Sequence, residues 1–200
     1  MNLIRHPWNL VFLVGFIIYI GIRHVFERRA KGNERIFRRI DALEIALMGL
    51  VGLGSLLLPV LYLFTPLFAF ADYVQLELVP WFGCAIMLAA LWLFWRSHAD
   101  LGENFSMSLE IRKEHQLIRR GVYRLIRHPM YASIWLFGIA QALLLPNWAA
   151  GFSAMVAFTP LYFLRTPREE KMLKEVFGEA YAEYMRQTGR VFPRFKWERR

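Results

Sequence analysis

The sequence predicts an all-α, polytopic integral membrane protein with about five transmembrane helices. Of its 200 residues, 56% are hydrophobic and 16% are aromatic, a more apolar composition than that of an ordinary soluble domain. The basic residues avoid five long apolar runs and gather between them. Because a spanning helix needs about 20 mainly apolar residues, these runs are the predicted spans. They cover residues 8–23, 42–64, 78–96, 130–145 and 148–164.

The Lys and Arg residues lie almost entirely on one side of these spans. Of the 25, all except Arg5 fall in residues 23–41, 96–130 and 165–200. Since cytoplasmic segments carry the excess of Lys and Arg in membrane proteins, these three segments are predicted to be cytoplasmic and the N-terminus to be outside. This topology, with attraction to anionic lipid headgroups, explains the formal net charge of +9. Nucleic-acid binding is therefore not expected.

Small residues help to interpret the first two apolar runs, because they mark signal-peptide cleavage sites and close helix packing. No small-residue cleavage site follows residues 8–23, and a basic loop begins at Arg23, so the first run is expected to stay as a helix and not to be cleaved as a signal peptide. The second run contains Gly49, Gly52 and Gly54. These glycines follow no predicted strand, so they indicate helix packing and not a dinucleotide-binding loop.

The last three runs are linked by short or polar segments. The third holds Cys84, the single cysteine, which excludes a disulfide within the chain. Only Pro146 and Asn147 separate the fourth run from the fifth, which predicts an antiparallel helical hairpin. Pro167 then suits the first turn of a new amphipathic helix on the membrane surface or against the polar loop. The apolar stripe of that helix is Leu173, Val176, Phe177, Ala180 and Tyr184.

The polar chemistry is concentrated in the second half of the chain. We therefore divide the sequence into an N-terminal three-helix membrane region, residues 1–98, and a catalytic region, residues 99–200. The longest polar segment begins at Ala99 and continues to the fourth run. Long loops in compact proteins are often functional, so this segment is expected to contribute to the site.

Several polar side chains gather where the fourth span begins. Pro129 can start that helix, and Arg127, His128 and Tyr131 surround its first turn. The free backbone N–H groups of such a turn can hold an anion, such as a carboxylate. The alternative is structural, with His128 as a cap and Tyr123 and Tyr131 in an aromatic belt at the headgroups.

A second cluster follows the fifth span. Arg165 stands where the apolar run ends, and Glu169 is four residues further on, so the two share a helix face, with Glu170 beside them. An ionisable residue at this depth is a functional candidate, although an Arg that only anchors the helix at the interface would look the same.

Taken in order, these motifs resemble the isoprenylcysteine carboxyl methyltransferase family of the prokaryotic type, within the wider isoprenylcysteine and phospholipid methyltransferase superfamily. The resemblance runs from Leu101 to Pro193. It rests on Leu101–Ser106, His115–Leu117, Gly121–Tyr123, Arg127–Tyr131, Arg165, Glu169–Glu170, Phe177–Gly178, Tyr181, Tyr184 and Arg190–Pro193.

This resemblance implies an enzyme that uses S-adenosylmethionine, releases S-adenosylhomocysteine and methylates the α-carboxylate of a prenylated cysteine that enters from the membrane lipid. It implies a cytoplasmic cofactor-binding loop and no metal site. Arg165 and Glu169 map to the reaction centre. His115, Leu117, Gly121, Val122, Tyr123, His128, Pro129, Tyr131 and Glu170 map to the cofactor pocket.

The chemistry of this residue set is consistent with methyl transfer to a carboxylate. A carboxylate is ionised at pH 7, so it needs no general base, and the planar guanidinium of Arg165 can hold it. Three alternatives stay open. The Glu169–Glu170 pair suits a phospholipid ethanolamine N-methyltransferase, in which an amine must lose a proton. A nicotinamide-dependent reductase could use the Arg-rich loop, and a small transporter would need polar groups within its spans.

Overall fold

The computed structural model describes residues 6–30, 35–38, 41–102, 110–112 and 117–194, and the fold is given for these residues. It is almost entirely helical, as predicted. The α-helices are α1 (Pro7–Ala30), α2 (Ala42–Gly52), α3 (Leu58–Phe64), α4 (Val79–Leu101), α5 (Pro129–Leu144), α6 (Trp148–Phe177) and α7 (Glu179–Gln187). A π-helical segment, η1 (Leu53–Leu57), joins α2 to α3, and η2 (Ala69–Ala71) and η4 (Gly121–Arg124) are short 3-10 helices.

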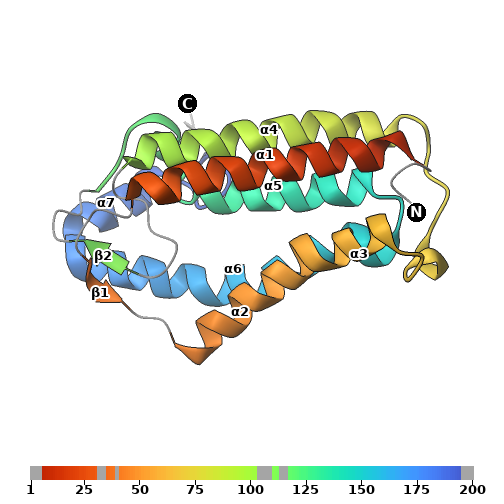
Figure 1. The fold of residues 1–200 in the computed structure, drawn as a ribbon. Coiled ribbons are helices and arrows are strands. Elements are labelled where there is room, and N and C mark those ends of the chain that lie inside the picture. The colour runs from red at the N-terminus through yellow and green to blue at the C-terminus, as the bar shows by residue number, and fades with distance from the viewer. Residues whose placement is uncertain (1–5, 31–34, 39–40, 103–109, 113–116, 195–200) are drawn as a thin grey trace.

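The sequence did not predict the one small sheet among these residues. Strands β1 (Arg35–Arg38) and β2 (Glu110–Arg112) pair antiparallel, with Arg35 opposite Arg112. Each strand belongs to one of the two polar segments that were predicted to lie on the same side of the membrane. The pairing therefore places these two segments together at one end of the helices (Figure 1).

The helices form two layers (Figure 1). Helices α1, α4 and α5 pack side by side in one layer, and α2, η1 and α3 pack with α6 in the other. The α5–α6 hairpin joins the layers at one end, while α7 and the two strands lie at the opposite end. The predicted hairpin is confirmed, and Asn147 caps α6 because its Oδ1 accepts a hydrogen bond from the Ala150 N–H at 2.8 Å.

The helical surface is that of an integral membrane protein. Three helical stretches of the described chain are long and apolar enough to cross a bilayer, namely Pro7–Arg29, Ala42–Phe64 and Val79–Leu101. Large apolar side chains such as Ile45 and Val156 are 63% and 70% exposed, as expected of groups that face lipid. Helix α5 is apolar but has only 16 residues, so the count of five spans stays a prediction.

The expectation that a new helix starts near Pro167 is wrong. Helix α6 continues through Pro160 and Pro167 to Phe177, and its C-cap Gly178 has a φ of 56°, a conformation that glycine adopts easily. Each proline removes one backbone hydrogen bond from α6, and the tertiary packing of the helix compensates for that loss. The predicted apolar stripe is therefore divided between α6 and α7, where Tyr181 and Tyr184 are buried.

The three glycines of the second span lie in different environments. A Cβ on Gly54 would lie 2.4 Å from the carbonyl oxygen of Ser153, so the helices could not pack this closely with a larger residue. The Ser153 hydroxyl also donates a 2.5 Å hydrogen bond to the Gly54 carbonyl. A Cβ on Gly49 or on Gly52 would meet no atom within 4 Å. The helix-packing interpretation is confirmed at Gly54 only.

We predict that Gly54→Ala destabilises the protein by about 1–3 kcal/mol, because the new methyl group overlaps the backbone of α6. Gly49→Ala is the matched control in the same span and should be neutral or stabilising by up to about 1 kcal/mol, since its Cβ has free space. Thermal unfolding of both variants in the same detergent measures the difference. Equal melting temperatures for the two variants would contradict the close contact at Gly54.

Candidate active site

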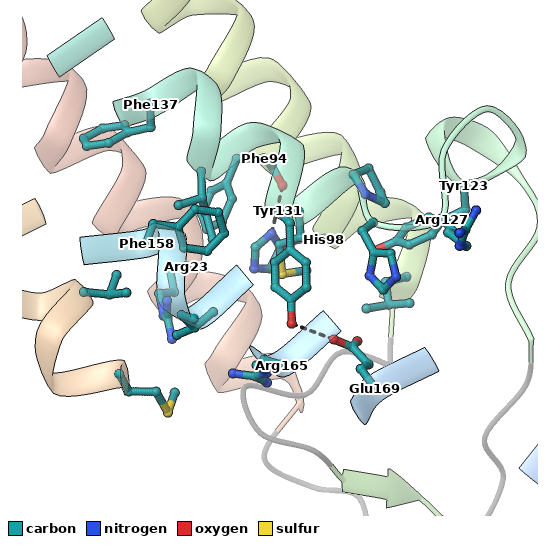
Figure 2. Close-up of a pocket in the computed structure, with 18 of the residues that line it drawn as sticks. Arg23, Phe94, His98, Tyr123, Arg127, Tyr131, Phe137, Phe158, Arg165 and Glu169 are labelled. Atoms are coloured by element: carbon teal, nitrogen blue, oxygen red, sulfur yellow. Dashed lines mark hydrogen bonds between the residues drawn. The ribbon is translucent and has the colours of Figure 1, made fainter. Parts of the chain in front are cut away.

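A cavity of about 400 Å³ lies between the two helical layers. One end is polar, and Tyr123, His128, Tyr131, Arg165 and Glu169 line it (Figure 2). Away from this end the walls become apolar. These walls include Phe16 of α1, Met48 and Leu56 of the second span, Phe137 of α5 and Phe158 of α6.

A tight turn at Gly121 positions Tyr123 at the polar end. Gly121 has a φ of 56°, and a Cβ there would lie 2.0 Å from Oδ2 of Asp100, so only glycine fits. The same Asp100 oxygen accepts the Val122 N–H at 2.9 Å, and Arg96 binds the other oxygen at 2.7 Å. Gly121 and Val122 therefore build the turn and do not line the cavity themselves.

The carboxylate of Glu170 is the centre of a buried ionic cluster. Its Oε1 accepts hydrogen bonds from Arg127 Nε at 2.6 Å and from Arg190 Nε at 3.1 Å, and lies 3.2 Å from His128 Nε2. Its Oε2 accepts a further bond from Arg190 Nη2 at 2.7 Å. Glu170 is 5% exposed. Glu170 does not line the cavity itself, but it binds Arg127 and His128, which do.

Backbone hydrogen bonds complete this connection. The Arg127 N–H donates to the Gly189 carbonyl and the His128 N–H to the Arg190 carbonyl, each at 2.9 Å. Arg127 Nη1 also donates to the Thr188 carbonyl at 2.7 Å. The segment before α5, the segment after α7 and helix α6 thus meet at one carboxylate.

These contacts change the acidity of Glu170. Burial alone raises its pKa, but hydrogen bonds from His128, Arg190 and Arg127 stabilise the ionised form more strongly and lower the pKa to about 2. The carboxylate is therefore ionised throughout the physiological range.

Glu169 is held on the cavity side of α6. Its Oε2 accepts a 2.5 Å hydrogen bond from the Tyr131 hydroxyl, which Figure 2 shows as a dashed line. The His128 ring stacks on the Tyr131 ring, with centroids 5.3 Å apart and planes 3° apart. His128 therefore contacts Tyr131 through its face and Glu170 through its edge.

The guanidinium of Arg165 faces the same space from α6. Its Nη1 lies 3.4 Å from Oε1 of Glu44, which is buried in the first turns of α2. Three residues further along α6, Arg168 pairs with Asp41, the N-cap of α2, at 3.1 Å, but this pair is half exposed. Both contacts hold the start of α2 against α6 beside the polar end of the cavity.

The structure brings most of the predicted site residues together. Leu117, Tyr123, His128, Pro129, Tyr131, Arg165 and Glu169 line the cavity, whereas Gly121, Val122 and Glu170 support it from behind. His115 lies outside the described residues. Across those residues, no group of three or more His, Cys, Asp or Glu could hold a metal ion.

Sequence reasoning missed three polar residues near this site. Arg23 and His98 line the cavity, and Glu44 pairs with Arg165. The only signal for Glu44 was its place as a charged residue inside an apolar span. No motif marked Arg23 or His98, because their role depends on how α1 and α4 pack.

Comparisons with known proteins agree on one family. The family model "Phospholipid methyltransferase" matches residues 78–180. Protein-S-isoprenylcysteine O-methyltransferase B of Arabidopsis thaliana is 29% identical, over 71% of this chain and 79% of that protein. The Saccharomyces cerevisiae protein-S-isoprenylcysteine O-methyltransferase is 28% identical, over 66% of this chain and 56% of that protein.

A solved membrane enzyme has a similar fold. It is the eukaryotic intramembrane Ras methyltransferase, an isoprenylcysteine carboxyl methyltransferase, with a TM-score of 0.52 and 20% sequence identity. The similarity covers 74% of this chain and 50% of that chain. This chain therefore shares a membrane fold with about half of a larger protein.

We predict that Glu170→Gln destabilises the protein by about 3 kcal/mol at pH 7, because it leaves the buried guanidinium of Arg127 without its counter-ion. The lowered pKa means that the stabilisation by Glu170 is complete above about pH 4.5 and is lost as the pH falls towards 2. The difference between wild type and Glu170→Gln should therefore be constant from pH 6 to 8 and shrink below pH 4. Unfolding in detergent at several pH values measures it.

The matched control is Glu175→Gln, an exposed position on the same helix. It should change stability by less than about 0.5 kcal/mol. If both variants unfolded like the wild type at pH 7, Glu170 would not be the centre of a stabilising cluster.

Proposed function

Because the chain belongs to the phospholipid methyltransferase family, whose model matches residues 78–180, we propose that it transfers a methyl group from S-adenosylmethionine to the α-carboxylate of a prenylated cysteine. The observation that carries this proposal is the cavity, which joins a polar end to an apolar space between membrane helices. A prenylated cysteine has the same division into a charged end and a hydrocarbon tail. The relatives named as isoprenylcysteine methyltransferases support this choice of acceptor.

The polar end fits the cofactor by its chemistry. The whole cavity, with a volume of about 400 Å³, lies within the range of small-molecule sites. Leu117, Tyr123 and Pro129 offer apolar and aromatic surface for a nucleoside, and aromatic faces also attract a sulfonium cation. His128 and Tyr131 add polar groups on the same wall. When bound there, S-adenosylmethionine supplies an electrophilic methyl group.

Gly121, Val122 and Glu170 have a supporting role in this proposal. Gly121 and Val122 fix the turn that carries Tyr123, and Glu170 fixes Arg127 and His128. We therefore assign Glu170 to positioning the pocket wall and not to binding the cofactor directly.

Arg165 is the residue that would orient the acceptor. Its planar guanidinium can hold both oxygens of a carboxylate, and the acceptor needs no base because it is already ionised. A grip on the carboxylate that is too strong would slow the reaction, since the carboxylate charge is lost as the methyl group arrives. Glu44 lies 3.4 Å from Arg165, and Glu169 adds a second negative charge to the same wall. These charges would moderate that grip.

Methylation of a phospholipid amine is the second candidate. Glu169 favours it, because a carboxylate at the cavity wall could accept the proton that the amine must lose. In that reaction Arg165 would repel a protonated ammonium, which makes the carboxylate acceptor the better match to this site.

The cavity also suggests which side of the membrane the reaction uses. Tyr184 of α7 lines the cavity beside Tyr123 of the polar end, and α7 lies at the same end of the helices as the two strands. All three elements belong to the basic segments of the chain. By the positive-inside rule, we propose that this end and the C-terminus face the cytoplasm and that the N-terminus lies outside.

We predict that the purified protein transfers label from radiolabelled S-adenosylmethionine to S-farnesyl cysteine as a base-labile ester. Arg165→Lys should lower kcat/KM for this acceptor by about 100-fold, because an ammonium keeps the charge but cannot hold the carboxylate at two points. The matched control is Arg168→Lys, one turn away on α6 and half exposed, which should keep its activity.

The chemical form of the label separates the two candidates. A base-stable label on phosphatidylethanolamine, with none on S-farnesyl cysteine, would contradict the carboxylate acceptor. Equal activity of wild type and Arg165→Lys would remove Arg165 from the mechanism.

A further inference from the structure

We infer that Gly52 sets the longest lipid tail that the cavity accepts. This inference rests on the proposed function, which makes a prenyl tail the occupant of the apolar part of the cavity. Gly52 lines the cavity and is partly buried. A Cβ added there would meet no atom within 4 Å, so the cavity is widened at this residue by the absence of a side chain.

Gly52 lies far enough from the reaction centre to contact the distal part of a bound tail. In the second span, Met48, Val51, Gly52 and Ser55 line the cavity. The span begins beside the reaction centre, where Glu44 lies 3.4 Å from Arg165. At a rise of about 1.5 Å per residue, Gly52 is about 12 Å further along the helix axis than Glu44.

Bulky side chains also line the cavity. Phe16 of α1 and Phe137 of α5 contribute to the opposite layer, and Phe158 of α6 contributes to the same layer as Gly52. Figure 2 shows Phe137 on the side of the site away from Arg165 and Glu169, with Phe158 between them. A tail that extends from Arg165 into the apolar part of the cavity would pass Gly52, a lining position with no side chain.

Gly52 and Gly54 are neighbours in the sequence but have different surroundings in the structure. The π-helical segment η1 starts directly after Gly52, and π-helical turns often occur at functional sites. Within it, Gly54 packs against α6, while Ser55 and Leu56 line the cavity. Gly54 therefore serves helix packing, and Gly52 leaves space for a ligand.

A larger residue at position 52 should fold normally. Gly52 has φ −60° and ψ −40°, which is ordinary right-handed helical backbone that any residue adopts. Replacing a helical glycine also removes a cost to helix stability. The side chain of Gly52→Leu would thus occupy the cavity without strain in the helix.

The experiment measures how tail length affects wild type, Gly52→Ala, Gly52→Leu and the control Gly49→Leu. Gly49 is exposed, and a Cβ there meets no atom, but this residue does not line the cavity. The ligands are cysteine thioethers with geranyl, farnesyl and geranylgeranyl tails. We expect Gly52→Leu to lower kcat/KM for geranylgeranyl relative to geranyl by about tenfold or more, with a smaller decrease in Gly52→Ala. Gly49→Leu should keep the wild-type order.

Ligand-induced thermal stabilisation, measured without methyl transfer, separates this inference from the proposed function. Loss of stabilisation by the longer tails only, in Gly52→Leu and not in Gly49→Leu, supports the inference even if no thioether is methylated. An unchanged length profile in Gly52→Leu, or an equal loss for all three tails in both Gly52 variants, overturns it. Phosphatidylethanolamine is the fourth ligand, and an effect of Gly52→Leu on its binding alone would also overturn the inference, since the occupant would then be an acyl chain.

Discussion

The buried ionic cluster at Glu170 is the constraint on which the polar end of the molecule depends. One carboxylate joins Arg127 and His128, which precede α5, to Arg190, which follows α7. Removing a buried counter-ion is costly, so this carboxylate stabilises the contact between the three segments. Glu170 itself does not line the cavity, but its partners Arg127 and His128 do. Glu169, the preceding residue of α6, faces the cavity and accepts a hydrogen bond from Tyr131.

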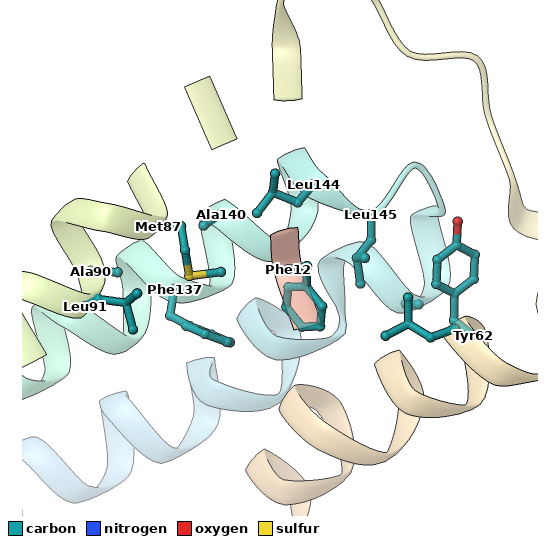
Figure 3. Packing of buried hydrophobic residues seen from close by; sticks show 11 residues of the cluster. Phe12, Tyr62, Met87, Ala90, Leu91, Phe137, Ala140, Leu144 and Leu145 are labelled. Carbon is teal, nitrogen blue, oxygen red and sulfur yellow. The ribbon is translucent and has the colours of Figure 1, made fainter. Parts of the chain in front are cut away.

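The membrane supplies the second constraint. Lipid offers no hydrogen bonds to the backbone, so the membrane-spanning parts of the chain fold as helices. The helices pack closely in one part of the molecule and leave a cavity in another. Buried aromatic and aliphatic side chains fill the space between α1, α4 and α5, including Phe12, Met87, Phe137 and Leu144 (Figure 3). The two layers are less tightly filled near α2 and α6, where the cavity lies. A charged site and a hydrocarbon-sized space therefore occur in one continuous cavity.

Sequence patterns predicted the helices and one side of the site. Hydrophobic run length located the spans, and the four-residue spacing of Arg165 and Glu169 placed both on the cavity face of α6. Patterns failed where tertiary contacts decide the outcome. Pro167 suggested a helix start, yet packing carries α6 through it. Gly52 and Gly54 look alike in the sequence, but only the approach of α6 separates a packing glycine from one that opens a cavity. Glu44 lies far from Arg165 in the chain, so nothing local connects them.

The central claim is that one cavity holds a charged acceptor at Arg165 and its tail between the two helical layers. Photo-crosslinking with a farnesyl cysteine analogue that carries a diazirine at the end of its tail tests this most directly, with crosslinked residues identified by mass spectrometry. The structure predicts labels on residues that line the apolar part, such as Met48, Phe137 and Phe158, and competition by unlabelled farnesyl cysteine. Labels confined to outward residues such as Ile45 and Val156, without competition, would contradict it.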